Sequence, residues 1–398
     1  MVRHVRLGTE AGKDIVLGTL FHDTTPLFPN LESVAVLMDG CAAPVVHLLF
    51  SSMLSCIEIN IGASTGRATG VERSGNIATY LSALGSSLIP VQKLNIRGFA
   101  CEKLNRAFSS LSTLKYLSLK VGTSLSATSL VNIANFPLLE ELFVHADRVN
   151  ADSLQESLAS SSSPTFSSLQ MLDIRSSVEV AATILQHARS TNFTRFSIEV
   201  TQDEDSAWTH LYSVIPTTIQ HIHIDHHIHL DDPTNNTTDI ISDHPFTTKR
   251  LDALPKFTTL RTFTLDTNVF VDFVDKDVEE LTKWWPTLRR FGLIISPYGE
   301  SKGGGALEAQ TAPWTPKLTV GCLNTIARGW PHLERLSLPV DLTSESQQLQ
   351  SFPIHPHLLE FNIIPSLPIE SRSPLVDAHI ALILELFPCV CKDFVVFE

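Results

Sequence analysis

The stretch "IQHIHIDHHIHLDD", residues 219–232, holds five histidines and three aspartates in fourteen positions. No other stretch is so rich in imidazole and carboxylate groups, the common ligands of zinc and other transition metals. A metal-dependent enzyme at the 221–229 histidine cluster is therefore one hypothesis for function. His221, His223 and Asp225 alternate along the chain, so in a strand they would share one face. They are the weak candidates for metal ligands.

Two further motifs resemble catalytic sequences. "GASTG" (62–66) matches the nucleophile elbow and would make Ser64 a nucleophile, but an elbow needs a helix directly after it. "RATGVERSG" has no apolar periodicity, which favours a flexible loop between repeats. "SKGGGALEAQ" (301–310) is rich in glycine, yet its order differs from a phosphate-binding loop. We therefore expect no catalytic residues, no enzyme activity and no cofactor.

Composition narrows the classes of function. Of the 398 residues, 43% are hydrophobic and 18% are charged, which supports a large core. The formal net charge of -13 argues against nucleic-acid or anionic-membrane partners. No apolar run is long enough to span a bilayer. The six cysteines form no disulfide framework, which favours a cytoplasmic or nuclear protein.

One short pattern recurs along the whole chain: an apolar residue, two variable ones, an apolar residue, one variable, an apolar residue. "FPNLESVAV" (28–36), "FPLLEELFV" (136–144) and "WPHLERLSL" (330–338) are clear copies. Twelve copies begin at Leu31, Leu54, Val91, Leu114, Leu139, Leu169, Phe193, Ile219, Leu260, Leu288, Leu333 and Leu358. Seven of the eleven intervals are 23 to 28 residues.

Each copy predicts a short strand with one buried face, and helical patterns lie between copies. The helical patterns cover 125–135, 150–160, 178–188, 276–285 and 373–387. Such a unit cannot bury its own core, so neighbours must stack. We predict an α/β leucine-rich-repeat solenoid, a horseshoe of about 12 irregular repeats, with a parallel sheet on the concave side and helices on the convex side.

The predicted domain organisation is a single leucine-rich-repeat domain over 1–398. Residues 1–30 form an N-terminal cap or first strand, 231–256 and 297–318 are inserted loops, and 373–398 form a C-terminal cap. The ninth position of each repeat is a small polar residue or glycine in ten of twelve copies, as a tight turn after the strand requires.

The aromatic-proline strand openings, irregular repeats and serine-rich linkers resemble those of fungal F-box-like leucine-rich-repeat proteins. The resemblance implies a substrate-recognition part of a ubiquitin-ligase receptor. The sequence departs from that family before Leu31, because "HVRLGTEAGKDIVLGTLFHDTTP" shows no F-box pattern. The segment "VRHVRLG" instead resembles the strand that follows the F-box in such proteins. A ubiquitin-ligase adaptor would therefore be a partner only if a missing F-box exists.

In this frame positions 3, 5 and 7 of each repeat face outward from the sheet. The seventh positions carry cations at Arg97, Lys120 and Arg175, followed by acids at Glu199, Asp225 and Asp266, and would steer a charged partner. The expected partner-binding residues on the concave face are Arg97, Lys120, Phe143, His145, Asp173, Arg175, Arg195, Glu199, His221, His223, Asp225 and Asp266.

These observations predict a non-catalytic protein-binding module that is a monomer. One alternative is a general interaction scaffold outside ubiquitylation, and the other is the metal-dependent enzyme. Within the histidine stretch, Ile219, Ile222 and Ile224 take the buried positions, and His227 takes the ninth, turn position. We expect the exposed histidines to make the charge of a binding face depend on pH.

Overall fold

The computed structural model describes residues 2–7, 28–37, 50–62, 67–99, 101–108, 110–121, 125–160, 165–202, 205–227, 246–269, 271–295, 316–343, 354–364 and 374–390. The chain divides into two compact units, Met1–Phe193 and Thr194–Glu398. We call them unit 1 and unit 2 and describe each by itself. Ser64 and residues 301–310 lie outside the described residues.

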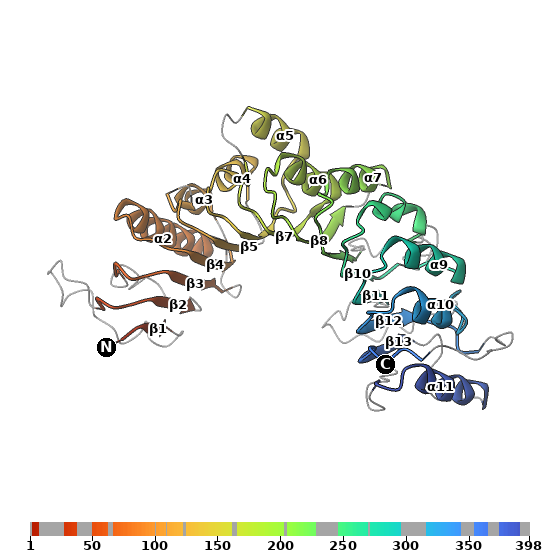
Figure 1. Cartoon of the computed structure of the whole chain (residues 1–398). Coiled ribbons are helices and arrows are strands. Elements are labelled where there is room, and N and C mark those ends of the chain that lie inside the picture. Colours follow the sequence, from red (N-terminus) through yellow and green to blue (C-terminus); the bar gives the residue numbers. More distant parts are fainter. Residues whose placement is uncertain are drawn as a thin grey trace. The chain divides into compact units, whose positions relative to one another are not determined.

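Strands alternate with helices through most of each unit, with the described helices on one side of each parallel sheet (Figure 1). Unit 1 contains β1 (His4–Leu7), β2 (Ser33–Leu37), β3 (Cys56–Ile61), α2 (Arg67–Ser86), β4 (Lys93–Gly98), α3 (Glu102–Phe108), β5 (Tyr116–Val121), α4 (Ala127–Ala134), β6 (Glu141–His145), α5 (Ala151–Ala159), β7 (Met171–Ser177) and α6 (Val178–His187). Unit 2 contains β8 (Arg195–Gln202), α7 (Asp205–Val214), β9 (His221–His226), η3 (Thr248–Leu251), η4 (Leu254–Lys256), β10 (Thr262–Thr267), α9 (Asp275–Trp284), β11 (Arg290–Ile295), α10 (Cys322–Gly329), β12 (Arg335–Pro339), β13 (Glu360–Ile364) and α11 (Pro374–Leu386).

Neighbouring strands within each unit pair in parallel and in sequence order. Every described pairing joins equal repeat positions, as Ile57 with Leu94 in unit 1 and Phe263 with Phe291 in unit 2. The register therefore confirms the predicted repeat frame. β1 adds one strand before the first counted repeat, where the sequence predicted a cap or strand.

The core is built from the first, fourth and sixth positions of the repeats. These side chains are buried in all twelve copies with the exception of Val36, which is half-buried. Their contacts lie between successive strands and the covering helices, so a repeat has no separate core. The chain is an α/β leucine-rich-repeat solenoid, as predicted. None of the described helices combines the length and apolarity needed to cross a membrane.

Helix starts follow local capping chemistry. The side chains of Ser126, Asn150 and Ser177 accept hydrogen bonds from the third residue of α4, α5 and α6, respectively. Each of these side chains satisfies an amide that would otherwise lack a partner at a helix start. Ser177 is also the ninth position of its repeat, so here the polar turn residue caps the next helix.

The interpretation of "RATGVERSG" as a loop was wrong, because these residues begin α2. The helix buries Arg73, Ser74, Ile77 and Leu81 along one face. A serine and an arginine occupy buried positions at its start, so the apolar period that identifies a helix is hidden there. Ser74 has a specific role, since its hydroxyl accepts from the amide of Cys101 at 2.8 Å.

The end of the predicted insert 231–256 also differs from a loop. Phe246, Leu251 and Leu254 are fully buried, and Phe246 forms a parallel bridge with Val271. Two short 3-10 helices, η3 and η4, fill the place of the helix between β9 and β10. The described part of 246–256 therefore belongs to the packed repeat. The remainder of this insert, and most of the 297–318 insert, lie outside the described residues.

Candidate functional site

The candidate site is the face of each sheet opposite the helices, which we call the open face. It carries the third, fifth and seventh positions of the repeats. All twelve predicted partner-binding residues lie on it, and none is fully buried. Unit 1 places Arg97 on β4, Lys120 on β5, Phe143 and His145 on β6, and Asp173 and Arg175 on β7. Unit 2 places Arg195 and Glu199 on β8, His221, His223 and Asp225 on β9, and Asp266 on β10.

Five ion pairs join charges near the start of the strands in successive repeats, although Arg290 lies opposite Arg335. At the second position, Lys115 pairs with Glu140 at 3.6 Å, and Arg289 pairs with Glu334 at 3.1 Å. Neighbouring strands thus bring opposite signs together in the way that favours a sheet. Similar pairs are Arg3–Glu32, Lys93–Glu58 and Arg335–Glu360. These charges have structural partners within the solenoid.

The seventh positions of unit 1 behave differently. Arg97 and Lys120 lie directly opposite each other in register on β4 and β5, and both side chains are exposed. No ion pair of either residue occurs among the residues that the structure describes. Arg175 pairs with Asp147 at 3.1 Å and is less available. We call Arg97, Lys120 and Arg175 the cationic row.

His145 lies in the cationic row without adding a charge at neutral pH. Its burial lowers its pKa, the cations Arg175 and Lys120 lower it further, and Asp147 opposes them. The imidazole is therefore neutral at pH 7, because its ordinary pKa is already below that pH. Protonation of His145 would bring a third cation beside Lys120 and Arg175.

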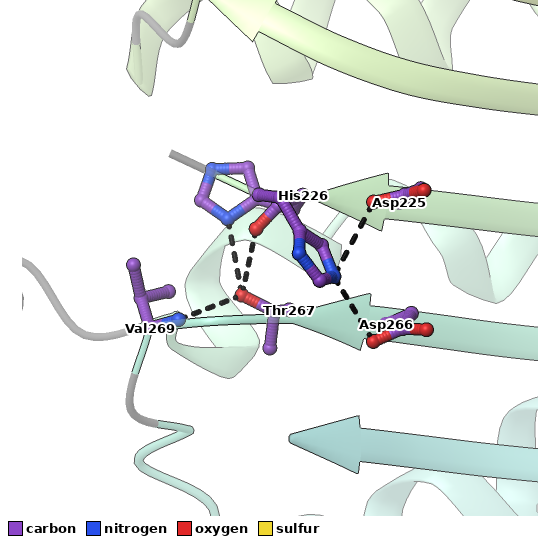
Figure 2. Close-up of polar contacts among 6 residues, drawn as sticks. Asp225, His226, Asp266, Thr267 and Val269 are labelled. Atoms are coloured by element: carbon purple, nitrogen blue, oxygen red, sulfur yellow. Dashed lines mark hydrogen bonds and ion pairs between the residues drawn. The ribbon is translucent and has the colours of Figure 1, made fainter. Parts of the chain in front are cut away.

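The seventh positions of unit 2 form an acidic row of Glu199, Asp225 and Asp266. Asp225 is in register with both of its neighbours. His227 Nε2 lies 3.2 Å from Asp266 Oδ1 and 3.4 Å from Asp225 Oδ1. The dashed lines that end at the labelled Asp225 and Asp266 in Figure 2 mark these two contacts. The hydrogen bond to Asp266 raises the pKa of His227, and the three carboxylates add to this against the effect of burial. His227 thus lies at its predicted turn position and also partly balances the acidic row.

His226 is a core residue that the sequence interpretation missed. It is fully buried, and its ring lies 5.6 Å from that of Phe246 and 6.1 Å from that of Trp208. Its Nδ1 lies 3.2 Å from the hydroxyl of Thr267, which donates to the carbonyl of His226 and accepts from the amide of Val269 (Figure 2). The buried polar groups of His226 thereby gain partners within the repeat.

The metal hypothesis has no geometric support in the described residues, because no three histidine, cysteine, aspartate or glutamate side chains there are grouped to hold an ion. His221 Nδ1 instead lies 3.0 Å from the hydroxyl of Thr262. Burial and the nearby Arg195 and Arg261 lower the pKa of His221. The histidine stretch divides into separate side chains: His223 is exposed, His226 is in the core, and His227 contacts two carboxylates.

Two open-face residues of unit 1 were absent from the sequence prediction. Tyr116 packs against Phe143 with ring centroids 5.1 Å apart, and Lys93 Nζ lies 5.0 Å from the Tyr116 centroid. The alternation already places Tyr116 and Lys93 on the same face as Phe143. Tyr116 could have been found from the sequence, because an aromatic residue at an outward strand position is not explained by packing in the core.

No protein-family model matches the sequence, and no curated protein matches it significantly. Among solved structures, the chain is similar to the leucine-rich repeat-containing protein LegL7 from Legionella pneumophila, with 14% identity over 73% of this chain and 90% of that one, and a TM-score of 0.39. It is also similar to a chain of the yeast Rad7 and Elc1 complex, with 12% identity over 83% and 74% of the two chains and a TM-score of 0.35. A Bacteroides fragilis protein has 13% identity over 69% of each chain and a TM-score of 0.37. Since these TM-scores are low, the fold assignment rests on the strand register and the buried repeat positions of this chain.

Proposed function

We propose that the protein is a non-catalytic protein-binding module whose partner docks on the open face. The observation that carries this proposal is the contrast between strand starts and strand ends. Near the starts, five ion pairs join opposite charges of successive repeats, with Arg290 opposite Arg335 as an exception, whereas like charges stand side by side at the seventh positions. Arg97 beside Lys120 is the clearest case; Asp225 also lies beside Asp266, although His227 contacts both of these carboxylates.

Like charges directly opposite each other on neighbouring strands destabilise a sheet, by roughly 0.2–1 kcal/mol per pair. The paired charges at the strand starts avoid this cost. At the seventh positions, a partner that supplies the opposite charges would remove this destabilisation. Concave faces of repeat solenoids are extended surfaces well suited to such binding.

The finer proposal is that the bound protein is a substrate, and that the chain is the recognition part of an F-box-type ubiquitin-ligase receptor. It rests on the sequence resemblance and on the solenoid fold. The alternative is a scaffold that holds partners outside ubiquitylation. The two differ in what happens to the partner: a ligase substrate is degraded, whereas a scaffold's partner is not.

Affinity capture with the full chain tests the binding proposal. We expect Arg97→Glu with Lys120→Glu, or Asp225→Lys with Asp266→Lys, to remove the captured partner. The matched control is Lys103→Glu, an exposed residue on helix α3. Capture that persists in both open-face variants would overturn the proposal.

The abundance of the captured partner then separates the finer proposals. Deleting the gene for this protein should raise the steady-state level and lengthen the half-life of a ligase substrate. An unchanged half-life, with binding intact, would instead support the scaffold. Co-purification of a ubiquitin-ligase adaptor is the second readout, and we expect it only where an F-box is also present.

A further inference from the structure

The open face of unit 1 combines an aromatic surface with two cations on adjacent strands, Arg97 and Lys120, which form no ion pair with any residue that the structure describes. Tyr116 on β5 and Phe143 on β6 are half-buried and lie against each other at 5.1 Å. Their rings extend from the side of the sheet that no described helix covers. An aromatic pair on a face made mostly of polar and charged residues offers an apolar contact to a ligand.

The register of the sheet fixes the spacing between the cations and Tyr116. Lys120 follows Tyr116 by four residues on the same strand, and Arg97 is in register with Lys120. At about 3.3 Å per residue, the Cα atoms of the two cations are displaced by roughly 13 Å along the strand direction from that of Tyr116. Phe143 is in register with Ser118 and lies two residues nearer to the cations. The side chains between them are Ser118 and Asn95, which are small and polar.

This spacing matches an extended polypeptide. In an extended chain, residues four apart lie on the same face and are separated by about the same 13 Å. An aromatic or aliphatic side chain at one residue can therefore rest on Tyr116 and Phe143 while a carboxylate four residues away reaches Arg97 and Lys120. Charge-assisted hydrogen bonds to these cations would fix its register.

The charges on this face favour a ligand with local rather than overall negative charge. Glu58, Glu141 and Asp173 are interspersed on the same open face, and Lys93 is already paired with Glu58 at 3.6 Å. The whole chain carries a formal net charge of -13. A polyanion such as RNA would meet these acids along its length, whereas a short segment with one or two carboxylates would avoid them.

We propose that the open face of unit 1 binds an extended acidic segment of a partner protein, with an apolar side chain on the Tyr116–Phe143 pair and a carboxylate four residues away on Arg97 and Lys120. This inference rests on the proposed function and adds to it the chemistry of the partner.

Binding of defined peptides to the full chain tests the inference by fluorescence anisotropy at low salt. The probe is the end-blocked, labelled peptide "ETSTFTSTE", which places a glutamate four residues from the phenylalanine on both sides and so fits either chain direction. Its threonines favour an extended chain. "TESTFTSET" has the same composition with the glutamates three residues away, on the opposite face. "ETSTSTSTE" lacks the aromatic ring.

We expect saturable binding of the first peptide that weakens with added salt, and at least about tenfold weaker binding of the other two. The double variant Arg97→Glu with Lys120→Glu and the single variant Phe143→Ser should each weaken binding of the first peptide by a similar factor. The double variant Arg261→Glu with Arg290→Glu reverses two exposed charges of unit 2 and should leave it unchanged. Far-ultraviolet circular dichroism and melting curves confirm that each variant is folded.

Equal affinity for all three peptides, or equal loss in both double variants, would show that only general charge attraction is present and would overturn the inference. Tighter binding of a nine-nucleotide single-stranded RNA than of "ETSTFTSTE", with the same loss in the unit 1 variants, would assign the surface to another class of ligand. The proposed function is tested separately by the capture experiment. It is contradicted if capture of the partner is insensitive to open-face variants in both units. If the peptide test fails but capture depends on Asp225 and Asp266, the proposed function stands and only this further inference is overturned.

Discussion

Thr267 allows a quantitative test of the buried polar network around His226. The substitution Thr267→Val keeps the branched shape of the side chain and removes its hydroxyl. That hydroxyl donates to the His226 carbonyl at 3.0 Å, accepts from the Val269 amide at 3.1 Å, and lies 3.2 Å from His226 Nδ1. Both Thr267 and His226 are fully buried, so water cannot replace these contacts without a rearrangement.

The expected loss follows from these three contacts. A buried hydrogen bond contributes about 0.5–1.5 kcal/mol net, so three of them contribute roughly 1.5–4.5 kcal/mol. The added methyl group of valine returns up to about 0.8 kcal/mol through burial. We therefore expect Thr267→Val to lower the free energy of unfolding by about 2–3 kcal/mol.

Urea unfolding followed by tryptophan fluorescence measures this loss where it occurs. All five tryptophans belong to unit 2, and the Trp208 ring lies 6.1 Å from that of His226. The matched control is Thr264→Val on the same strand, since the Thr264 hydroxyl makes no hydrogen bond among the described residues. We expect the control to change the free energy of unfolding by less than about 0.5 kcal/mol. Equal losses in the two variants would refute the assignment of this network.

Three further outcomes are expected. Because the pKa of His227 is raised in the folded state, its protonated form stabilises the fold below its ordinary pKa, and this stabilisation is lost as pH rises through the raised value. The variant His227→Asn should therefore have a lower midpoint urea concentration of unfolding than wild type near about pH 5.5, and the same midpoint near about pH 8.5. Leu142→Ala should lower the free energy of unfolding by about 2–5 kcal/mol, whereas Leu138→Ala, at a site 46% exposed, should lower it by less than about 1 kcal/mol, and similar values would contradict the repeat frame. Gly98→Ala should destabilise by at least about 2 kcal/mol in a melting experiment, because its φ is 109° and an added Cβ would lie 1.9 Å from the Ile61 carbonyl oxygen; wild-type stability would contradict this backbone conformation.

The repeat frame was predictable because it rests on burial. A strand that packs on one side keeps apolar residues at its buried positions even where its exposed positions vary. The first, fourth and sixth positions therefore identify the register. The same alternation also covers the eighth position, which the prediction did not use. Ile61, Ser176, His226 and Thr267 occupy that position and are fully buried. Extending the frame by one residue would have placed His226 in the core instead of in a possible metal cluster.

Other features depend on contacts that a sequence does not display. The first turns of α2 bury Arg73 and Ser74, so an apolar period is missing where the helix begins. The open-face location of the charged residues was predictable from alternation alone. The ion pairs of these charged residues could not be predicted, because a partner can lie outside the neighbouring strand. Arg175 pairs with Asp147, which is two residues beyond the end of the neighbouring strand. Arg97 and Lys120 have no ion pair among the described residues.

Hydroxyl-radical footprinting of the captured complex is the most direct test of the claim that partners dock on the open face. The modification rates of exposed or half-exposed side chains are compared with and without the partner. We predict protection of Tyr116 and Phe143 in unit 1 or of His223 in unit 2, with unchanged rates at Leu88 and Met53, which are exposed away from the open-face positions. Protection at Leu88 and Met53, with unchanged rates at Tyr116, Phe143 and His223, would contradict the account.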